Sequence, residues 1–388
     1  MHILYISDVF FPRINGVSTS IETFRSELIA AGHRVTLIAP HYLPTKEVIR
    51  EAYDIYRIPS RPVPRDPEDR LMSYKSALGW VKELRPLRVD LVHIHTPFVA
   101  HYAGLGIARA LGVPCVATYH TYFEEYLAHY LPFLPGSWVR AAARRFSRAQ
   151  CNDMDAVVVP SLAMSDILKS YGVNKPLTVL PTGIPEDFFR PGDGSRFRAR
   201  HGIPPDRPMA LFVGRVAFEK NIGFLLEVID QAGRALPDLL LVVAGEGPAL
   251  PALREEAQRL GLAEQVNFVG YLDRQSGLRD CYAAADAFVF ASRTETQGLV
   301  LLEAMAQGVP VVGLALMGTI DIITPARGAV AAPDQVAGFA DCLVGILGDS
   351  NVSRRAALAV EARAFALEWS AAERAREVAE LYRSLLGN

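Results

Sequence analysis

Short apolar runs alternate with longer amphipathic stretches along the whole chain. The runs are almost continuous in apolar and β-branched residues, which is typical of parallel strands that are buried on both faces. The predicted strands span 2–7, 34–39, 54–58, 90–94, 114–118, 155–159, 177–180, 209–213, 239–244, 266–269, 286–291 and 309–313. Helical periodicity lies between them, for example at 18–31, 222–235, 248–260 and 299–307. This alternation predicts α/β domains with doubly wound parallel sheets.

The strand–helix pattern occurs twice, with a break near 190–208 where Gly, Pro and Asp are dense. We therefore predict two facing Rossmann-like domains, at 1–190 and 207–369. The last segment, about 354–387, is helical, and we expect its end, about 370–388, to cross back onto the first domain. Ligands in open parallel sheets bind outside the carboxyl ends of the strands, so the chemistry is expected in loops that follow strands.

Composition narrows the classes of protein. A length of 388 residues fits two domains, and a net charge of −2 argues against a nucleic-acid binder. The first strand-like run begins at His2 with no signal-peptide pattern before it, and no apolar stretch reaches the roughly 18 residues that span a bilayer. The four cysteines lack metal-ligand spacing. We expect a cytoplasmic protein whose contact with membranes is at most peripheral.

The first chemical motif follows the first predicted strand. Asn15-Gly16 predicts a tight turn, and Ser18 or Thr19 is suited to cap the helix that follows. Such a helix start attracts anions, although an ordinary strand–helix turn explains the motif equally well. The glycine fingerprint of nicotinamide dehydrogenases is absent here, and the isolated Gly-x-Gly pairs elsewhere are weak signals.

The second motif places two cations after a strand of the second domain. The strand ends at Gly214, and Arg215 and Lys220 follow five residues apart at the start of a helix. A guanidinium that grips two oxygens and an ammonium beside it suit a diphosphate. The alternative is a solvated surface pair.

The third motif has two glutamates eight residues apart. Glu295 lies on the loop after a predicted strand, and Glu303 lies inside an apolar helix. A carboxylate among apolar residues is costly unless it is hydrogen-bonded, and vicinal hydroxyls of a ribose or hexose are natural partners. A helix-capping glutamate with a surface glutamate is the alternative.

Histidines end two neighbouring strands of the first domain. His93 and His95 alternate, so both are expected to face one side of the sheet, and His120 directly follows the next strand. His120 is suited to donate to a sugar hydroxyl or a backbone carbonyl, whereas His93 is best explained as a core residue. Asp153 and Asp155 match a metal-binding Asp-x-Asp pattern, but Asp155 begins a strand, and we predict no metal site.

Together these motifs resemble family 4 of the retaining glycosyltransferases, which has the GT-B fold, over nearly the whole chain. The resemblance implies a first domain that binds the acceptor and a second domain that binds a nucleotide-sugar. It implies that Gly16 lies by the phosphates or acceptor, and that His120 contacts the reacting sugar. It implies that Arg215 and Lys220 neutralise the leaving diphosphate, with catalytic roles for both and for Glu295. The donor-binding set it implies is Gly16, Gly214, Arg215, Lys220, Glu295, Gly298, Leu299, Val300 and Glu303.

The same resemblance implies transfer with retention of the anomeric configuration, with no metal and no cofactor beyond the nucleotide-sugar donor. The chain departs from the family pattern at Thr296-Gln297, where Pro-Phe is usual, and at Met317-Gly318, where a double glycine is common. Asp321 is suited to be the acidic residue that ends this loop. These departures leave the sugar open, with a UDP-sugar favoured and GDP-mannose next.

An aromatic stretch at 121–138 and a basic helix at 138–149 suggest the acceptor. Arg140, Arg144, Arg145 and Arg148 share one face at helical spacing. An aromatic loop beside a cationic face suits an anionic membrane, and the stretch resembles that of glycosyl-diacylglycerol synthases. A solvated basic face explains the pattern equally well. The hypothesis is a lipid or glycan acceptor at the membrane surface.

Three other functions remain open. A transferase that builds polysaccharide or lipopolysaccharide would share every motif. A sugar-nucleotide epimerase of the same fold would make less use of the paired glutamates and paired cations. A non-enzymatic nucleotide-binding interaction module would have no need of His120 together with these cations.

Overall fold

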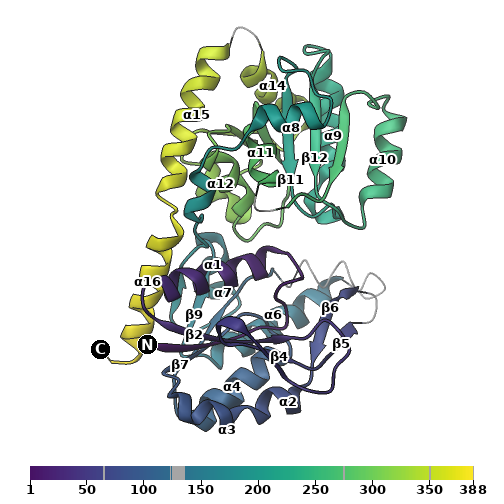
Figure 1. Cartoon of the computed structure of the whole chain (residues 1–388). Coiled ribbons are helices and arrows are strands. Elements are labelled where there is room, and N and C mark those ends of the chain that lie inside the picture. The colour runs from purple at the N-terminus through teal and green to yellow at the C-terminus, as the bar shows by residue number, and fades with distance from the viewer. Residues whose placement is uncertain (64–65, 123, 125–135, 274–275, 349–350, 388) are drawn as a thin grey trace. The chain divides into compact units, whose positions relative to one another are not determined.

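The computed structural model describes residues 1–63, 66–122, 124, 136–273, 276–348 and 351–387. The chain divides into two units, which are described separately (Figure 1). Unit 1 consists of Met1–Gly183 together with Ala371–Asn388, and unit 2 consists of Ile184–Ser370. The last helix therefore belongs to the first unit, as the sequence predicted. No helix in the described part of the chain is both long and apolar enough to cross a membrane.

Unit 1 is built on an eight-stranded sheet of order β10-β9-β8-β7-β1-β2-β4-β3. Its strands are β1 (His2–Ile6), β2 (Arg34–Pro40), β3 (Ile49–Glu51), β4 (Ile55–Ile58), β7 (Leu91–Ile94), β8 (Cys115–Thr118), β9 (Ala156–Val159) and β10 (Leu177–Val179). All pair in parallel except β3 with β4. The chain runs outward from β1 in one direction and then outward from β7 in the other, so the topological switch point lies between β1 and β7.

Helices cover both faces of this sheet (Figure 1). They are α1 (Gly16–Ala30), α2 (Tyr74–Gly79), α3 (Val81–Leu84), α4 (Val99–Leu111), α6 (Gly136–Asn152), α7 (Leu162–Ser170) and α16 (Ala371–Leu385). A separate antiparallel sheet consists of β5 (Ser60–Val63) and β6 (Asp66–Met72). Helix α16 packs beside α1 and buries Val378, Ala379 and Tyr382 in the same core as Tyr5. Burial of apolar side chains at about 25 cal/mol per Å² is what holds this helix on unit 1.

A glycine explains the close packing of α4 on the other face. A side chain at Gly104 would bring its Cβ within 2.7 Å of Ile94 and 2.9 Å of Ile6. Gly104 therefore serves helix–sheet contact, and Gly106 lets α4 approach α2, since a Cβ at Gly106 would lie 2.9 Å from Leu78.

Unit 2 has a six-stranded parallel sheet of order β13-β12-β11-β14-β15-β16. Its strands are β11 (Met209–Val213), β12 (Leu240–Ala244), β13 (Val266–Gly270), β14 (Ala287–Phe290), β15 (Val311–Gly313) and β16 (Ala329–Ala331). Counted along the chain, this is the 3-2-1-4-5-6 order of dinucleotide-binding sheets, with its switch point between β11 and β14.

Helices flank this sheet as well. They are α8 (Gly194–Arg200), α9 (Ile222–Gly233), α10 (Leu250–Arg259), α11 (Gly277–Ala283), α12 (Leu299–Ala306), α13 (Ile320–Ile323), α14 (Val336–Leu347) and α15 (Val352–Leu367). Helix α14 packs on α9, while α12 packs on α15. Short 3-10 turns complete the chain at η1 (Ala52–Asp54), η2 (Arg85–Leu87), η3 (Glu186–Phe189), η4 (Phe218–Lys220) and η5 (Met317–Thr319).

The segment 190–208, predicted as a linker, is instead an ordered part of unit 2. It contains α8, which packs on α11, and Arg196 in α8 forms an ion pair of 2.6 Å with Asp280. Gly192 and Gly194 are glycines because a Cβ at either would lie within 2.5 Å of the backbone of α11. Tight packing thus explains two of the three glycines in this segment, and the third, Gly202, has a left-handed φ of 65°.

Candidate functional site

Two loops meet at the switch point of unit 2. One follows β11 and runs through residues 214–221, and the other follows β14 and runs through 291–298. The amide of Asn221 donates to the carbonyl of Ala291 at 3.1 Å, and the hydroxyl of Ser292 donates to the carbonyl of Glu219 at 3.3 Å. The second and third sequence motifs, separated by about 80 residues in the chain, are thus joined by direct hydrogen bonds.

An ion pair crosses this junction. The Nζ of Lys220 donates to Oε1 of Glu295, and the two side chains are 23% and 17% exposed. Arg215 lies half-buried on the same loop as Lys220. A cation that is partly withdrawn from water and fixed outside the carboxyl ends of parallel strands is suited to hold an anionic group.

Glu303 is one of the most deeply buried carboxyl groups in unit 2. It lies in α12 with 2% of its surface exposed, and its Oε2 accepts a hydrogen bond of 2.8 Å from the hydroxyl of Tyr282, itself fully buried. The interpretation of Glu303 as a surface glutamate is therefore wrong. Tyr282 was not predicted as a partner, because only the packing of α11 against α12 brings the two together.

The start of α12 depends on Gly298. This residue is the N-cap of the helix with φ of 89°, a left-handed conformation that favours glycine. Leu299 and Val300 follow in the first turn and are half-buried. The first backbone N–H groups of a helix have no partner within the helix, so this turn offers donors near Glu295 in the chain.

Other glycines let neighbouring loops touch through their backbones. A Cβ at Gly245 would lie 1.9 Å from the carbonyl oxygen of Gly214, and one at Gly247 would lie 2.3 Å from that of Val216. Gly318 donates from its N–H to the carbonyl of Glu295 at 2.8 Å, and a Cβ there would lie 2.0 Å from the oxygen of Thr296. The 317–319 turn thus packs against the loop that carries Glu295 and holds that loop in place.

In unit 1, the first motif begins α1 differently from the prediction. The N-cap is Asn15, whose side chain accepts from the N–H of Ser18 at 2.9 Å, while the Ser18 hydroxyl accepts from the N–H of Asn15 at 2.9 Å. The helix therefore starts at Gly16, two residues earlier than expected. Gly16 is exposed, with nothing within 4 Å of the position that a Cβ would take.

An aspartate that the sequence reading did not single out fills the switch point of unit 1. The Asp8 carboxylate accepts from the Thr96 hydroxyl at 2.8 Å and from the N–H of Ala100, near the start of α4, at 3.1 Å. In return, the Asp8 N–H donates to the Thr96 oxygen at 2.6 Å. Burial raises the pKa of Asp8 to about 6. Asp8 thus joins the loops after β1 and β7 in unit 1, just as the Lys220–Glu295 pair joins the loops after β11 and β14 in unit 2.

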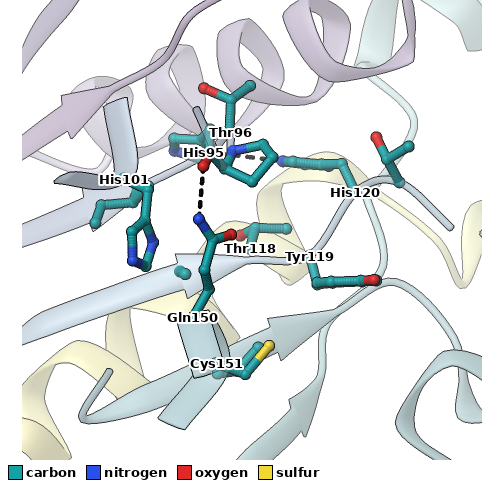
Figure 2. A pocket seen from close by; sticks show the side chains of 13 residues that line it. His95, Thr96, His101, Thr118, Tyr119, His120, Gln150 and Cys151 are labelled. Atoms are coloured by element: carbon teal, nitrogen blue, oxygen red, sulfur yellow. Dashed lines mark hydrogen bonds between the residues drawn. The ribbon is translucent and has the colours of Figure 1, made fainter. Parts of the chain in front are cut away.

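The three predicted histidines form one stack. The rings of His93 and His95 lie 4.2 Å apart at 29°, and those of His95 and His120 lie 5.6 Å apart at 24°. His93 bonds the Tyr382 hydroxyl at 2.6 Å and the Thr118 hydroxyl at 2.7 Å, so its interpretation as a core residue is confirmed. Nδ1 of His95 lies 3.3 Å from Nε2 of His120 (Figure 2).

These rings are held neutral. Desolvation lowers the pKa of His93 to about 3 and that of His120 to about 4, and it lowers the pKa of His95 well below its usual value. A cavity of about 40 Å³ lies beside them, lined in part by His95, Thr96, His101, Thr118, His120 and Gln150. Near neutral pH these three rings therefore present uncharged donors and acceptors, whereas the unit 2 loops present charges.

Asp155 has a structural role. Its carboxylate accepts from the N–H of Cys115 at 2.8 Å and so joins the starts of β8 and β9. This confirms the interpretation of the Asp-x-Asp pattern as a strand entry.

Comparison with known proteins decides the family. A sequence profile described as Glycosyltransferase Family 4 matches residues 14–188, and one described as Glycosyl transferases group 1 matches residues 193–364. The alpha-monoglucosyldiacylglycerol synthase of Streptococcus pneumoniae (strain ATCC BAA-255 / R6) is 35% identical over 319 residues, which cover 80% of this chain and 70% of that protein. The chain belongs to glycosyltransferase family 4.

Two further likenesses agree with this. The alpha-monoglucosyldiacylglycerol synthase of Acholeplasma laidlawii is 30% identical, with 80% of each chain covered. The structure of a sucrose-phosphate synthase from Thermosynechococcus elongatus matches with a TM-score of 0.81 at 22% identity, covering 100% of this chain and 99% of that one. The GT-B fold predicted from the sequence is confirmed.

The basic helix of this glycosyltransferase is only partly as predicted. Arg140, Arg144, Arg145 and Arg148 are all exposed on α6. Arg144 nevertheless has a structural role, because it donates two hydrogen bonds of 3.0 and 2.6 Å to the buried carboxylate of Glu124. The aromatic residues at 125–135 lie outside the described residues, whereas Trp138 is described and is 75% exposed.

Proposed function

We propose that this glycosyltransferase moves a hexose from a UDP-sugar to a lipid acceptor, diacylglycerol or a glycolipid, at a membrane surface. The observation that carries the proposal is the Lys220–Glu295 pair at the unit 2 switch point, with buried Glu303 on the helix that follows. A diphosphate needs fixed cations, and a sugar needs carboxylates that accept from its hydroxyls. The lipid acceptor is supported by the likeness of this chain to two alpha-monoglucosyldiacylglycerol synthases.

We assign roles to the site residues as follows. Lys220 and Arg215 neutralise the charge that develops on the leaving diphosphate, aided by the N–H groups of Gly298, Leu299 and Val300. On binding, the donor competes with Glu295 for Lys220, which frees Glu295 to accept from sugar hydroxyls. Glu303 accepts from the ribose hydroxyls, and Gly214 keeps the loop close to the phosphates. No metal is required, because protein cations supply the charge.

In unit 1, we assign His120 to the reacting sugar and Gly16 to the phosphates or acceptor. The reaction proceeds with retention. The bond between the anomeric carbon and the diphosphate oxygen breaks while the acceptor oxygen bonds the same carbon from the same face. The proton of the acceptor hydroxyl passes to the departing phosphate oxygen, so no protein base is consumed.

The membrane contact is proposed for the exposed face of α6. Arg145, Arg148 and Trp138 offer two cations and an aromatic ring on one short stretch of helix. Cations near an anionic surface contribute about 1 kcal/mol each, and exposed tryptophan favours the headgroup region.

The deciding experiment has two stages. Thermal shift of the purified protein is measured with UDP, GDP, ADP and their sugars, with and without EDTA. A nucleotide at about 100 times its Kd should stabilise the protein by about 2.7 kcal/mol, which is about 5–10 °C for a unit of this size. The shift should persist in EDTA and fall to about half in Glu303→Gln, while the surface variant Glu256→Gln keeps it in full.

The second stage measures transfer from the identified donor to diacylglycerol in vesicles, with the anomeric configuration of the product read by NMR. An α-linked product from an α-linked donor supports retention. A shift with GDP instead of UDP would move the proposal to a GDP-mannose-dependent transferase of polysaccharide or lipopolysaccharide. No shift with any nucleotide, together with function retained in His120→Ala, would favour an interaction module.

A further inference from the structure

The contact between His95 and His120 carries information about where the protons lie. Nδ1 of His95 is 3.3 Å from Nε2 of His120, so one nitrogen must donate and the other must accept (Figure 2). Desolvation keeps both rings neutral near pH 7, and each ring therefore carries one N–H. Two arrangements are possible, and they differ in the tautomer of His120.

The second nitrogen of His95 distinguishes the two arrangements. His95 is 2% exposed, and its Nε2 makes no hydrogen bond to any described residue. If His120 donated, the proton of His95 would sit on this Nε2 as a buried N–H with no partner, the rarer kind of unsatisfied group. If His95 donates from Nδ1, its only N–H is paired and Nε2 is left as a bare acceptor.

The surroundings hold His95 in this orientation. Its ring packs against Tyr5, with centroids 4.5 Å apart, and against His93, with centroids 4.2 Å apart. His93 in turn is fixed by hydrogen bonds to Tyr382 from α16 and Thr118 from β8. The amide of Gln150, which also lines the cavity, is already engaged, since it donates to the carbonyl of Pro97 at 2.7 Å.

We propose that His95 is a positioning residue that donates from Nδ1 to Nε2 of His120 and so keeps the His120 proton on Nδ1. His120 then offers Nδ1–H as a donor to the reacting sugar. This deepens the proposed function and rests on it for the role of His120, but the tautomer itself can be tested without any substrate.

The first test reads the tautomer directly. Protein labelled with ¹⁵N-histidine is observed by NMR at pH 7, and the His120 signals are assigned from their loss in His120→Asn. We expect Nδ1 of His120 to be protonated and Nε2 to be unprotonated in the free protein. We expect Nε2 to become the protonated nitrogen in His95→Leu, with His201→Asn as a control that leaves the His120 signals unchanged. A protonated Nε2 in the wild type would overturn the proposal.

The second test separates positioning from packing. His95→Asn keeps an N–H donor near the Nδ1 position, His95→Gln places its amide near the Nε2 position, and His95→Leu has no donor. We expect kcat within about 5-fold of wild type for His95→Asn and about 10–100-fold lower for the other two, with KM for the nucleotide-sugar unchanged. Equal losses in all three variants, accompanied by equally lowered Tm, would indicate a merely structural role and overturn the proposal.

The two tests keep the proposals distinct. If His120→Ala retains full transfer activity, the assigned role of His120 in the proposed function fails, and the NMR result still decides the tautomer. If the tautomer is as proposed and His95→Leu is fully active, His95 positions a residue that the reaction does not use.

Discussion

Lys220, on the loop after β11, forms an ion pair with Glu295, on the loop after β14, directly across the strand switch point of unit 2. In the absence of donor the pair satisfies both charges, so neither is left partly buried and alone. The same two groups are the ones assigned to the diphosphate and the sugar. In the proposed function, a nucleotide-sugar opens this ion pair, because its diphosphate binds Lys220 and its sugar hydroxyls donate to Glu295.

Lys220→Gln should abolish most activity while the fold survives. Removing one fixed cation from a leaving phosphate should lower kcat by about 100-fold or more. A double-mutant cycle with Glu295→Gln should give a coupling of about 1 kcal/mol in urea unfolding, because both side chains remain partly solvated. Lys169→Gln, on an exposed pair in α7, is the matched control. Activity within 3-fold of wild type would exclude the assigned role.

Substitutions of Glu303 and Tyr282 should have different effects on nucleotide binding and on the stability of the fold. Tyr282→Phe removes the donor to a carboxylate that is 2% exposed and should cost about 1–3 kcal/mol in urea unfolding. Glu303→Gln keeps an acceptor for Tyr282 and should cost less stability, yet it should weaken nucleotide binding in calorimetric titration by about 10-fold. The assignment of Glu303 to the ribose does not survive if Glu303→Gln binds the nucleotide as tightly as wild type does.

Because of the histidine stack, we expect the folded protein to lose stability in acid. His120 has a pKa of about 4 in the folded protein and about 6.5 when unfolded, so between these pH values the unfolded state binds more protons. Each such histidine should cost about 1.4 kcal/mol of stability per pH unit as pH falls below 6.5. Asp8, whose pKa is raised to about 6, acts oppositely and makes the fold less stable as pH rises from about 4 to 6.

Because these contributions overlap, the histidine share is measured by difference. Urea unfolding of wild type and His120→Asn at pH 5, 6 and 7 should show a shallower pH dependence in the variant. Asp8→Asn should make the loss of stability in acid steeper. Parallel curves for wild type and His120→Asn would contradict the assigned histidine pKa.

The contact of Tyr382, in the last helix, with His93 should contribute to the stability of unit 1. Tyr382→Phe removes the hydroxyl that bonds His93 at 2.6 Å and Tyr5 at 3.2 Å, leaving a buried imidazole nitrogen unpaired. The expected cost is about 1–3 kcal/mol in urea unfolding. Tyr5→Phe leaves the bond from Tyr382 to His93 intact and should cost less. Equal stabilities of the two variants would show that the contact with His93 contributes little.

Charge reversal on α6 should distinguish membrane contact from folding. Arg145 and Arg148 are exposed and form no ion pair within the described residues, so Arg145→Glu/Arg148→Glu should fold normally. Its affinity for anionic vesicles should fall by about 30-fold or more in sedimentation, at about 1 kcal/mol per cation. Arg144→Glu should instead lower Tm, because Glu124 would lose its partner.

The control for charge alone is Arg354→Glu/Arg355→Glu on α15, which changes net charge equally. Binding of every variant to phosphatidylcholine vesicles should be weak and similar. If the α6 and α15 pairs reduce binding to anionic vesicles equally, net charge explains the effect and α6 is not the contact.

Most strands and the principal helices followed from local pattern, because a strand buried on both faces must be apolar throughout. Strands β3, β5, β6 and β16 were missed because they lie at a sheet edge or in the separate two-stranded sheet, so they lack the apolar run of a strand that is buried on both faces. The start of α1 was misplaced because two residues near it were good caps, and only the backbone shows that Asn15 and Ser18 cap each other.

The sequence by itself determined the chemistry available to this protein. Its strand-ending loops carry the glycines, the cations, the glutamates and the histidines, and parallel strands place such loops at one edge of a sheet. The sequence did not determine which polar residues pair with one another in the folded protein. Tyr282 with Glu303, Asp8 with Thr96 and Tyr382 with His93 join residues separated by 21, 88 and 289 positions. Hydrogen bonds and ion pairs act over a few ångströms in space, so only the tertiary structure decided which polar groups would be buried together and held neutral or charged.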